Sequence, residues 1–407
     1  MEQTRAKLWR WAWPKRARLW WLVHQWAGLK LSILLTFIFA TGTLAVLSHE
    51  IDWLFHPSLR VDMATVEGET NWEAIATAAL AQPETASIRS IDAPEAGAFA
   101  AQVTITRPDG SLAFLNAHPT TGEIQGVQSW VGAQRILRNM HRHLNMPLDI
   151  GVPLVSVLSF LLLASFFSSL VVYKRWWRGF FRPIRWRNAR TALGDLHRLS
   201  GVWSLWFVLL MAVTGVWYFA ESVGLQAPPA VAEKAETVIA PAEAATALPP
   251  SLTVARQEFP GLALDRIIFP TRPGQAFRFE GHADAILVRP RANAVWTEPA
   301  TAEVLAVRHG EELSLHQRIS EAADPLHFGY FGGYWTKLIW FVFGLALTFL
   351  AVSGVAIYAA RLVRKTREGG PGAIRLAWNG MGVWKWPATA AVLAGFVLLY
   401  PLVVGPR

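Results

Sequence analysis

Five uninterrupted apolar runs, each about long enough to cross a membrane, constrain this chain more than any other feature. They cover Leu31–Leu47, Val152–Tyr173, Val202–Ala220, Leu338–Ala360 and Ala388–Val404. An α-helix of about 20 residues spans a hydrocarbon core of about 30 Å. The sequence therefore predicts a polytopic membrane protein with five spans in contact with the lipid bilayer. Because the first run leads into Ser48-His49-Glu50 instead of a small-residue cleavage site, we expect it to remain as an anchor.

The distribution of charge predicts the orientation of these spans. Of the 29 acidic residues, only Glu2, Asp195 and Glu368 lie outside the two long segments 48–149 and 221–334. Lys and Arg concentrate in the other stretches, before the first span and after the second and fourth spans. By the positive-inside rule these basic stretches face the cytoplasm. We therefore expect a bacterial inner-membrane protein with a cytoplasmic N-terminus and two large periplasmic loops. The net charge of +9 then reflects the orientation of the spans and does not indicate a nucleic-acid site.

The chain reads as two copies of one unit. His24-Gln25-Trp26-Ala27-Gly28-Leu29 opens the first span and His197-Arg198-Leu199-Ser200-Gly201-Val202 opens the third. Each is followed by a long acidic segment with short β-type runs: Ala98–Thr106 and Leu112–Ala117 in the first, Ala276–Glu280 and Ala285–Val288 in the second. A repeat of this kind predicts that the two halves pack about a common axis.

The fold class that we expect is a mainly α membrane protein. Its four-helix transmembrane core comes from two parallel repeats plus a fifth C-terminal span, with two small α+β periplasmic modules. A Pro- and Ala-rich stretch, 226–250, is predicted as a flexible lead-in to the second module. The expected segments are a cytoplasmic basic N-terminus 1–19, a first span 20–48, a first module 49–140, a second span 141–173, a cytoplasmic basic loop 174–195, a third span 196–220, a second module 221–326, a fourth span 327–360, a cytoplasmic loop 361–386 and a fifth span 387–404.

Four histidines sit at equivalent points of the repeat. His24 and His197 open the first and third spans, and His141 and His327 precede the second and fourth. Ionisable side chains at membrane depth are costly and usually face partners inside a bundle. Equivalent residues of two parallel repeats face each other across the axis, so one haem iron is expected between His24 and His197 and a second between His141 and His327. Cysteine is absent, which excludes c-type attachment and Cys-ligated clusters.

Some assignments stay open at this level. His143 lies within the alignment error of His141, and His49 is an alternate ligand for the same end of the spans. His49 also forms a possible substrate-facing surface with Glu50 and His56. His118, in the first acidic segment, is predicted to be an ordinary surface residue.

These motifs resemble the PepSY-associated transmembrane family, which includes inner-membrane ferric-siderophore reductases of the FoxB type and iron-uptake proteins. The residues that carry the resemblance lie between about 20 and 365: the two histidine-opened spans above, Met140-His141-Arg142-His143-Leu144 and Leu326-His327-Phe328-Gly329. The resemblance implies a membrane-embedded protein with two haem b groups that passes electrons outward to iron held by a siderophore. The fifth span departs from the family pattern.

We therefore expect an oxidoreductase that reduces a ferric siderophore, or another ferric complex, at the periplasmic face. Its electron donor is a separate cytoplasmic reductase or quinol. Reduction loosens the iron because hard oxygen ligands favour Fe(III) over Fe(II). Two other classes remain open: a non-redox PepSY-type regulatory or binding protein, and a siderophore or metal permease whose histidines bind the cargo directly.

Overall fold

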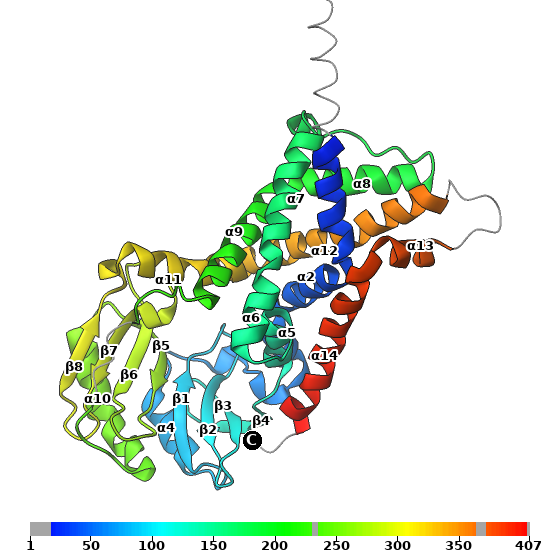
Figure 1. The fold of residues 1–407 in the computed structure, drawn as a ribbon. Coiled ribbons are helices and arrows are strands. Elements are labelled where there is room, and N and C mark those ends of the chain that lie inside the picture. The colour runs from blue at the N-terminus through cyan, green and yellow to red at the C-terminus, as the bar shows by residue number, and fades with distance from the viewer. Residues whose placement is uncertain (1–17, 230–234, 364–371, 405–407) are drawn as a thin grey trace, which may run out of the picture. The chain divides into compact units, whose positions relative to one another are not determined.

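The computed structural model describes residues 18–229, 235–363 and 372–404, and these divide into two compact units. One unit is helical and contains the apolar runs, and the other is built on a sheet. Figure 1 shows the ribbon with its labelled elements. The predicted N-terminal segment 1–19 falls almost entirely outside the described residues.

The helical unit contains the candidate membrane spans. Within the described part of the chain, four helices are long and apolar enough to cross a bilayer, and a fifth span results if two helices separated by a bend count as one. The spans are Leu148–Val172, Leu205–Ser222, Gly333–Val363, Gly382–Val403 and the bent pair Arg18–Lys30 with Ser32–Val46. In terms of elements, these are α6 (Leu148–Ser156) with α7 (Leu158–Val172), α9 (Leu205–Ser222), α12 (Gly333–Val363), α14 (Lys385–Val404) and the helix Arg18–Lys30 with α2 (Ser32–Val46).

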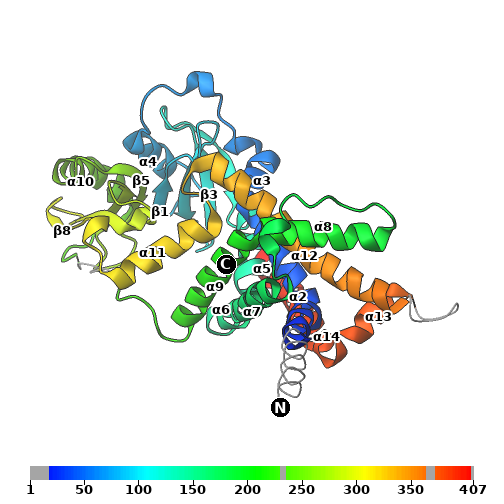
Figure 2. The ribbon, with the colours of Figure 1, turned by 90° about the horizontal axis from the view of Figure 1, so that it is seen from above.

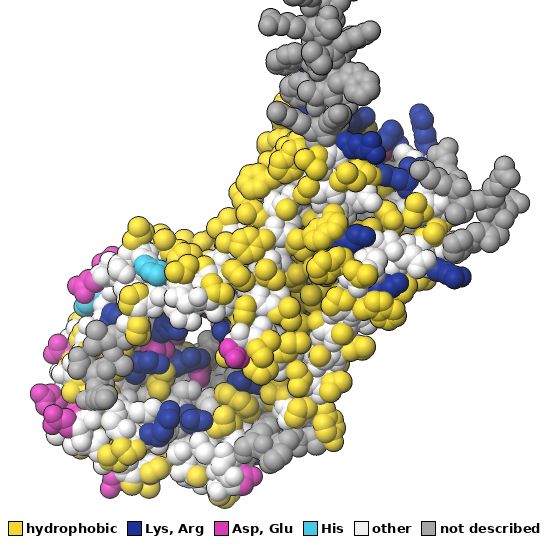
Figure 3. Space-filling view, viewed as in Figure 1, with side chains coloured by type: hydrophobic (Ala, Val, Ile, Leu, Met, Phe, Trp, Pro, Cys, Tyr) yellow, Lys and Arg dark blue, Asp and Glu magenta, His cyan; other side chains and the backbone are white. Residues whose placement is uncertain are grey.

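Shorter helices lead into these spans. They are α5 (Ala133–His143), α8 (Ala189–Trp203), α11 (Leu315–Phe328) and α13 (Ala373–Gly380). Figures 1 and 2 show α8 lying across α12. Lys and Arg side chains gather at one end of the helical unit, near α8 and α13, and apolar side chains cover the helices (Figure 3).

Both segments that the sequence predicts as continuous first spans of a repeat are broken. The first bends by 68° between Lys30 and Ser32, where Leu31 leaves helical geometry with φ −110° and ψ 23°. In the second half, α8 ends and α9 begins at Ser204, with φ −90° and ψ 2°. Each break follows its opening histidine, His24 or His197, by the same seven positions. Apolar runs indicate burial in lipid but carry no signal for a bend. The sequence therefore does not predict the breaks within the spans 20–48 and 196–220.

Two apolar clusters hold the helices together. One joins Leu34, Leu35 and Ile38 of α2 to Val155 and Leu158 of the second span, and it includes Ala388 of α14 at 1% exposure. The other joins Phe207 and Val208 of α9 to Trp340 and Leu347 of α12. The C-terminal helix thus packs against the bundle through Ala388 and does not lie wholly in lipid.

The second unit is built on one antiparallel sheet of eight strands. Its order is β4-β3-β2-β1-β5-β6-β7-β8, so two four-stranded meanders join through β1 and β5. The strands are β1 (Ser87–Asp92), β2 (Ala101–Thr106), β3 (Leu112–Ala117), β4 (Ile124–Ser129), β5 (Ala263–Ile268), β6 (Phe277–His282), β7 (Asn293–Thr297) and β8 (Val304–Arg308). At the junction Ser90 pairs with Ile268 and Asp92 with Arg266.

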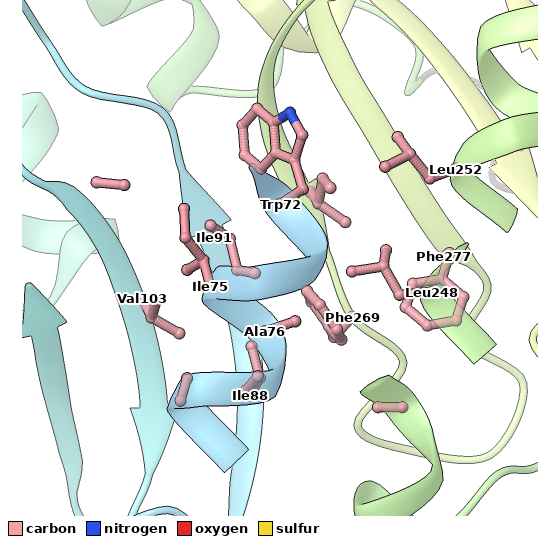
Figure 4. Packing of buried hydrophobic residues seen from close by; sticks show 14 of the residues in the cluster. Trp72, Ile75, Ala76, Ile88, Ile91, Val103, Leu248, Leu252, Phe269 and Phe277 are labelled. Atoms are coloured by element: carbon pink, nitrogen blue, oxygen red, sulfur yellow. The ribbon is translucent and has the colours of Figure 1, made fainter. Parts of the chain in front are cut away.

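One helix from each half covers the same face of this sheet. They are α4 (Trp72–Leu80) and α10 (Ala244–Glu258), and α3 (Ser48–Phe55) precedes the first meander. Figure 4 shows Ile75 of α4 and Leu248 of α10 packed over Ile91 and Phe277 of the strands. Alternate strand residues point to this core because successive side chains in a strand face opposite ways. Short 3-10 turns lie at Pro57–Leu59, Met63–Thr65, Trp176–Arg178, Pro241–Glu243, Pro290–Ala292, Gly310–Glu312 and Gly382–Trp384.

Three local predictions are wrong. Ala285–Val288 is not a strand, because Leu287 adopts a left-handed φ of 54° and the next strand begins only at Asn293. The predicted flexible lead-in 226–250 ends in helix, since α10 starts at Ala244 and buries Leu248. His118 is buried at 7% exposure and bonded through Nε2 to Thr65 Oγ1 at 2.9 Å.

Candidate functional site

His141 and His327 come together in the helical unit. His141 lies in the last turn of α5 and His327 in the last turn of α11. Their ring centroids are 6.0 Å apart and their planes meet at 39°. Two imidazoles that share one metal ion have centroids roughly 6 Å apart, because each metal–nitrogen bond measures about 2 Å. The separation fits a single iron between the two rings.

Hydrogen bonds at Nδ1 determine which nitrogen of each ring carries the proton. His141 Nδ1 lies 2.8 Å from the Ile38 carbonyl, which only accepts, so this nitrogen carries the proton. His327 Nδ1 lies 2.8 Å from Thr214 Oγ1. The Thr214 hydroxyl donates to the Leu210 carbonyl at 2.8 Å, so it accepts from the imidazole. Both rings therefore present the Nε2 lone pair, the form that a metal requires.

His24 and His197 have the same arrangement. His24 Nδ1 lies 3.1 Å from Ser168 Oγ and His197 Nδ1 lies 2.8 Å from Ser353 Oγ. Each serine hydroxyl donates to a carbonyl one turn back in its own helix, and its oxygen is left to accept from the imidazole. The two imidazoles are near enough to interact electrostatically. This second pair also presents Nε2 on both rings.

Each of the four histidines forms its Nδ1 hydrogen bond with a residue of its own half of the chain, whereas each pair combines one histidine from each half. His24 bonds to the second span and His197 to the fourth, each within its own half. His141 precedes the span Leu148–Val172, and Ser168, the partner of His24, lies near the end of that span. The two pairs therefore lie toward opposite ends of the candidate spans.

Glycines beside the histidines set how closely the helices approach. A Cβ on Gly42 would lie 2.6 Å from the His141 ring, so only glycine lets α2 pack against this imidazole. Among the described residues, a Cβ on Gly28, one turn after His24, would meet nothing within 4 Å, and a Cβ on its counterpart Gly201 would meet only Leu350, at 3.7 Å. Open space on the histidine-bearing face of both helices is what a planar macrocycle between them requires.

Buried charges anchor the helices that carry the histidines. Asp52 accepts hydrogen bonds from the backbone N–H groups of Ala133 at 2.7 Å and Gln134 at 2.9 Å, which caps the start of α5. Toward the end of α11, Glu321 receives a bidentate bond from Arg289 at 2.7 and 3.0 Å. Burial favours the neutral form of Glu321, but Arg289 and then Arg291 hold its pKa below the usual value.

Another charged contact fixes α8 just before His197. Asp195 is 7% exposed in its side chain and receives two bonds from the Arg185 guanidinium, at 2.9 and 3.0 Å. Its pKa is lowered to about 2, first by the hydrogen bond from the Arg185 side chain. Arg185 thereby ties the basic loop to the helix that bears His197.

The alternate residues have other partners. His143 is 9% exposed and its Nδ1 donates to the Met146 carbonyl at 2.7 Å, within the turn that ends α5. His49 lies 3.8 Å from Glu95, and His56 Nδ1 lies 2.9 Å from the Asp52 carbonyl. His49 and Glu50 belong to α3, and His56 follows it directly. The structure brings His141, not His143, next to His327.

Sequence reasoning missed the hydroxyl partners of the imidazoles. Ser168 and Ser353 occupy corresponding places in the second and fourth spans, and each holds one of the paired histidines. An alignment of the two halves that extended to these serines would have identified them. Thr214 was visible as part of the Thr-Gly motif but carried no assigned role.

Comparison with known proteins bears directly on this arrangement. The family model described as the PepSY-associated TM region matches residues 21–361. The chain belongs to the PepSY-associated transmembrane family. The matched region of this family member contains all four paired histidines and the whole sheet, and it ends before α13 and α14. A Pseudomonas aeruginosa protein described as "Uncharacterized protein PA4219" is 38% identical over 80 residues, which is 20% of each chain, so the match spans about a fifth of that protein's length.

Proposed function

We propose that this PepSY-family chain is a transmembrane electron carrier that holds two haem b groups and reduces a ferric complex. The observations that support it most are the 6.0 Å between the ring centroids of His141 and His327 and the hydrogen bond at Nδ1 of all four imidazoles. In each ring this bond makes Nε2 the unprotonated nitrogen. An axial ligand needs this tautomer, because the metal binds the unprotonated nitrogen.

Residues of the chain have distinct roles in this proposal. His24 with His197, and His141 with His327, would each hold one haem, which supplies reversible one-electron exchange when bound. Ser168, Ser353, Thr214 and the Ile38 carbonyl orient the four rings and make them better electron donors to the metal. The apolar residues of the bundle exclude water, which also tunes the reduction potential.

The substrate class rests on the resemblance and on coordination chemistry. A ferric siderophore that accepts one electron becomes a ferrous complex, and its hard oxygen ligands hold Fe(II) far less tightly than Fe(III). In this proposal the sheet unit is periplasmic, the protein lies in the inner membrane, and the basic ends near α8 and α13 face the cytoplasm. The two four-stranded meanders are then the PepSY-type modules of two parallel repeats.

Haem quantitation on the purified protein tests this proposal. We expect a reducible b-type Soret band and two haems per chain, falling to one in His197→Ala and in His327→Ala. His143→Ala and His316→Ala serve as controls and should retain two, with circular dichroism and elution volume confirming the fold. A colourless, folded protein would contradict the carrier function and favour a regulatory protein or a permease. Unchanged haem content in both ligand variants would refute the pairing.

A further inference from the structure

A groove opens on the helical unit along the helix that bears His24. Its volume is about 410 Å³, within the range of about 300–1,000 Å³ that is usual for small-molecule sites. We call it the Gln25 groove. Its lining includes Leu22, Gln25, Trp26 and Lys30 of the helix Arg18–Lys30, together with Tyr358 of α12 and Gly380 of α13.

Most of the lining is apolar and faces outward. Leu22 is 46% exposed and Trp26 is 42% exposed, on a helix that belongs to a candidate membrane span. A Cβ on Gly380 would lie 2.4 Å from the Tyr358 ring, so α13 ends in close contact with α12 and closes one side of the groove. A ligand with a lipophilic chain is compatible with this wall.

Two polar groups interrupt the apolar lining. Gln25 Oε1 is buried, and it has no hydrogen-bond partner within the described part of the chain. A buried acceptor without a partner costs about 1–3 kcal/mol, so a ligand that brings a proton donor is favoured here. The residue lies one position after His24 in the same helix.

Lys30 is the second polar group. Its Nζ donates to the Gly380 carbonyl at 2.7 Å, and an ammonium group has three protons to donate. A charged side chain in a membrane span is costly and usually has a function. Lys30 therefore offers donors at the same groove where Gln25 offers an acceptor.

We propose that the Gln25 groove binds the head group of a membrane quinol, which supplies the electrons of the carrier function proposed above. A quinol is a ring with two hydroxyl groups and an isoprenoid tail. One hydroxyl donates to Gln25 Oε1 once the amide turns this buried oxygen toward the groove, and the carbonyl that forms on oxidation accepts from Lys30 Nζ. The tail lies along Leu22 and Trp26 toward the lipid. This inference rests on the proposed function for the identity of the electron acceptor. The quinol-binding site itself does not depend on that function.

The electron balance closes with the two haems of the proposed function. Oxidation of one quinol breaks two O–H bonds, releases two protons to water and yields the quinone. Two electrons leave one after the other, and the haems that the two histidine pairs would hold would each take one. His24, which precedes Gln25 in the chain, would hold the haem that takes an electron first.

Other occupants match the groove less well. A lipid phosphodiester would satisfy Lys30, but the phosphodiester itself has no proton to donate to Gln25 Oε1; phosphatidylglycerol, whose head group also carries hydroxyls, is therefore the competing ligand in the test. A water-soluble reductase would meet exposed Leu22 and Trp26 at a site that lies on a membrane-spanning helix. Among these ligands, only a quinol matches the donor, the acceptor and the apolar wall together.

Photolabelling of the full-length protein in nanodiscs tests the site. The probe is a short-tail azido-ubiquinone, with decylubiquinone as competitor, and labelled peptides are identified by mass spectrometry. We expect labelling within residues 19–30 or beside Tyr358. Gln25→Leu and Lys30→Met should each raise the half-competing concentration of decylubiquinone about 3- to 10-fold, as loss of one hydrogen bond implies. Lys385→Met is the matched control, because its Nζ lies over the Trp378 and Trp386 rings outside the groove.

Labelling elsewhere, wild-type competition in both variants, or displacement of the probe by phosphatidylglycerol but not by decylubiquinone would overturn the proposal. Haem content is measured on the same samples. Protein that holds haem but is not labelled at the groove refutes the quinol site and leaves the carrier function intact. Protein without haem refutes the carrier function, and the labelling still reports whether the groove binds quinone.

Discussion

Thr214 Oγ1 accepts a hydrogen bond from His327 Nδ1 at 2.8 Å while donating its own proton to the Leu210 carbonyl at the same distance. Because a backbone carbonyl of α9 takes the Thr214 proton, Thr214 can only accept from His327. The α9 backbone thereby determines which nitrogen of His327 carries the proton. In the other half, the Ile38 carbonyl bonds His141 directly, at 2.8 Å. A hydroxyl orients one of these two rings and a backbone carbonyl orients the other, and in both rings Nδ1 carries the proton.

Replacing Thr214 by valine should weaken haem binding at the His141–His327 pair. The imidazole loses the acceptor that orients it, and loss of such a partner typically costs about 10- to 100-fold in metal affinity. Transfer of haem to apomyoglobin measures the effect, and Thr214→Ser should restore the wild-type rate. Thr348→Val is the matched control, because within the described part of the chain the Thr348 hydroxyl bonds to the Gly344 carbonyl of its own helix and to Thr43, and not to a histidine or its partner. Equal transfer rates in all four proteins would contradict the role of Thr214.

Gly28→Ala probes the space beside His24 and His197. In the structure the new methyl group meets no atom within 4 Å, and alanine favours helix over glycine by about 1 kcal/mol. We therefore expect unchanged or raised thermal stability of the haem-free protein, together with loss of one haem, because the methyl group takes space that a macrocycle would fill. Gly194→Ala also meets nothing within 4 Å and is the control. Two haems retained in Gly28→Ala would show that no macrocycle lies over this turn.

Asp52→Ala should destabilise the start of α5. The substitution removes the acceptor for two backbone N–H groups, and loss of a helix cap costs about 1–2 kcal/mol. The expected result is a lower midpoint of thermal unfolding and faster proteolysis near residues 130–134. Asp62→Ala is the comparison, because Asp62 caps only a short, exposed 3-10 turn. An equal effect of the two substitutions would argue against a special role for Asp52.

His282 predicts a small pH dependence of stability in the sheet unit. The hydrogen bond from His282 to Asp265 raises the pKa of this imidazole. Stabilisation is then complete below the unfolded value of about 6.5 and is lost as pH rises through the raised folded value. Because the His282 side chain is 53% exposed, we expect an effect on the order of 1 °C in the unfolding midpoint.

The measurement is the midpoint difference between wild type and His282→Gln from pH 5 to pH 9. It should be largest at the acidic end and disappear at the basic end. Asp265→Asn removes the same partner and should abolish the same pH dependence. A difference that grows with pH would have the wrong sign for this ion pair.

The sequence predicted the spans from composition and the family from motifs that resemble it. The predicted pairing of His141 with His327 agrees with the 6.0 Å between their ring centroids. Continuous apolar runs locate helices in lipid, and equivalent positions in two halves locate residues near a shared axis. Whether His141 or His143 faces His327 was beyond this reasoning. That choice depends on the turn at the end of α5, where Leu144 and Asn145 have left-handed φ values of 53° and 56°.

The joined sheet was also beyond prediction. Each acidic segment carried enough β-type runs to suggest a small module, but nothing local indicates that Ser90 pairs with Ile268. Such pairing depends on which edges are left uncovered once each meander has formed. The bends at Leu31 and Ser204 were missed because backbone geometry at these positions is set by packing between helices, not by a proline or a glycine.

The junction between β1 and β5 has a consequence for biosynthesis. Asp92 and Arg266, which form an ion pair across it, are 174 positions apart in the chain. Until the ribosome has delivered β5, the β1 edge of the first meander has exposed backbone donors and acceptors that another nascent chain can pair with. Production of the first half alone therefore exposes an aggregation-prone edge, and successful expression of fragments requires both halves to be made together.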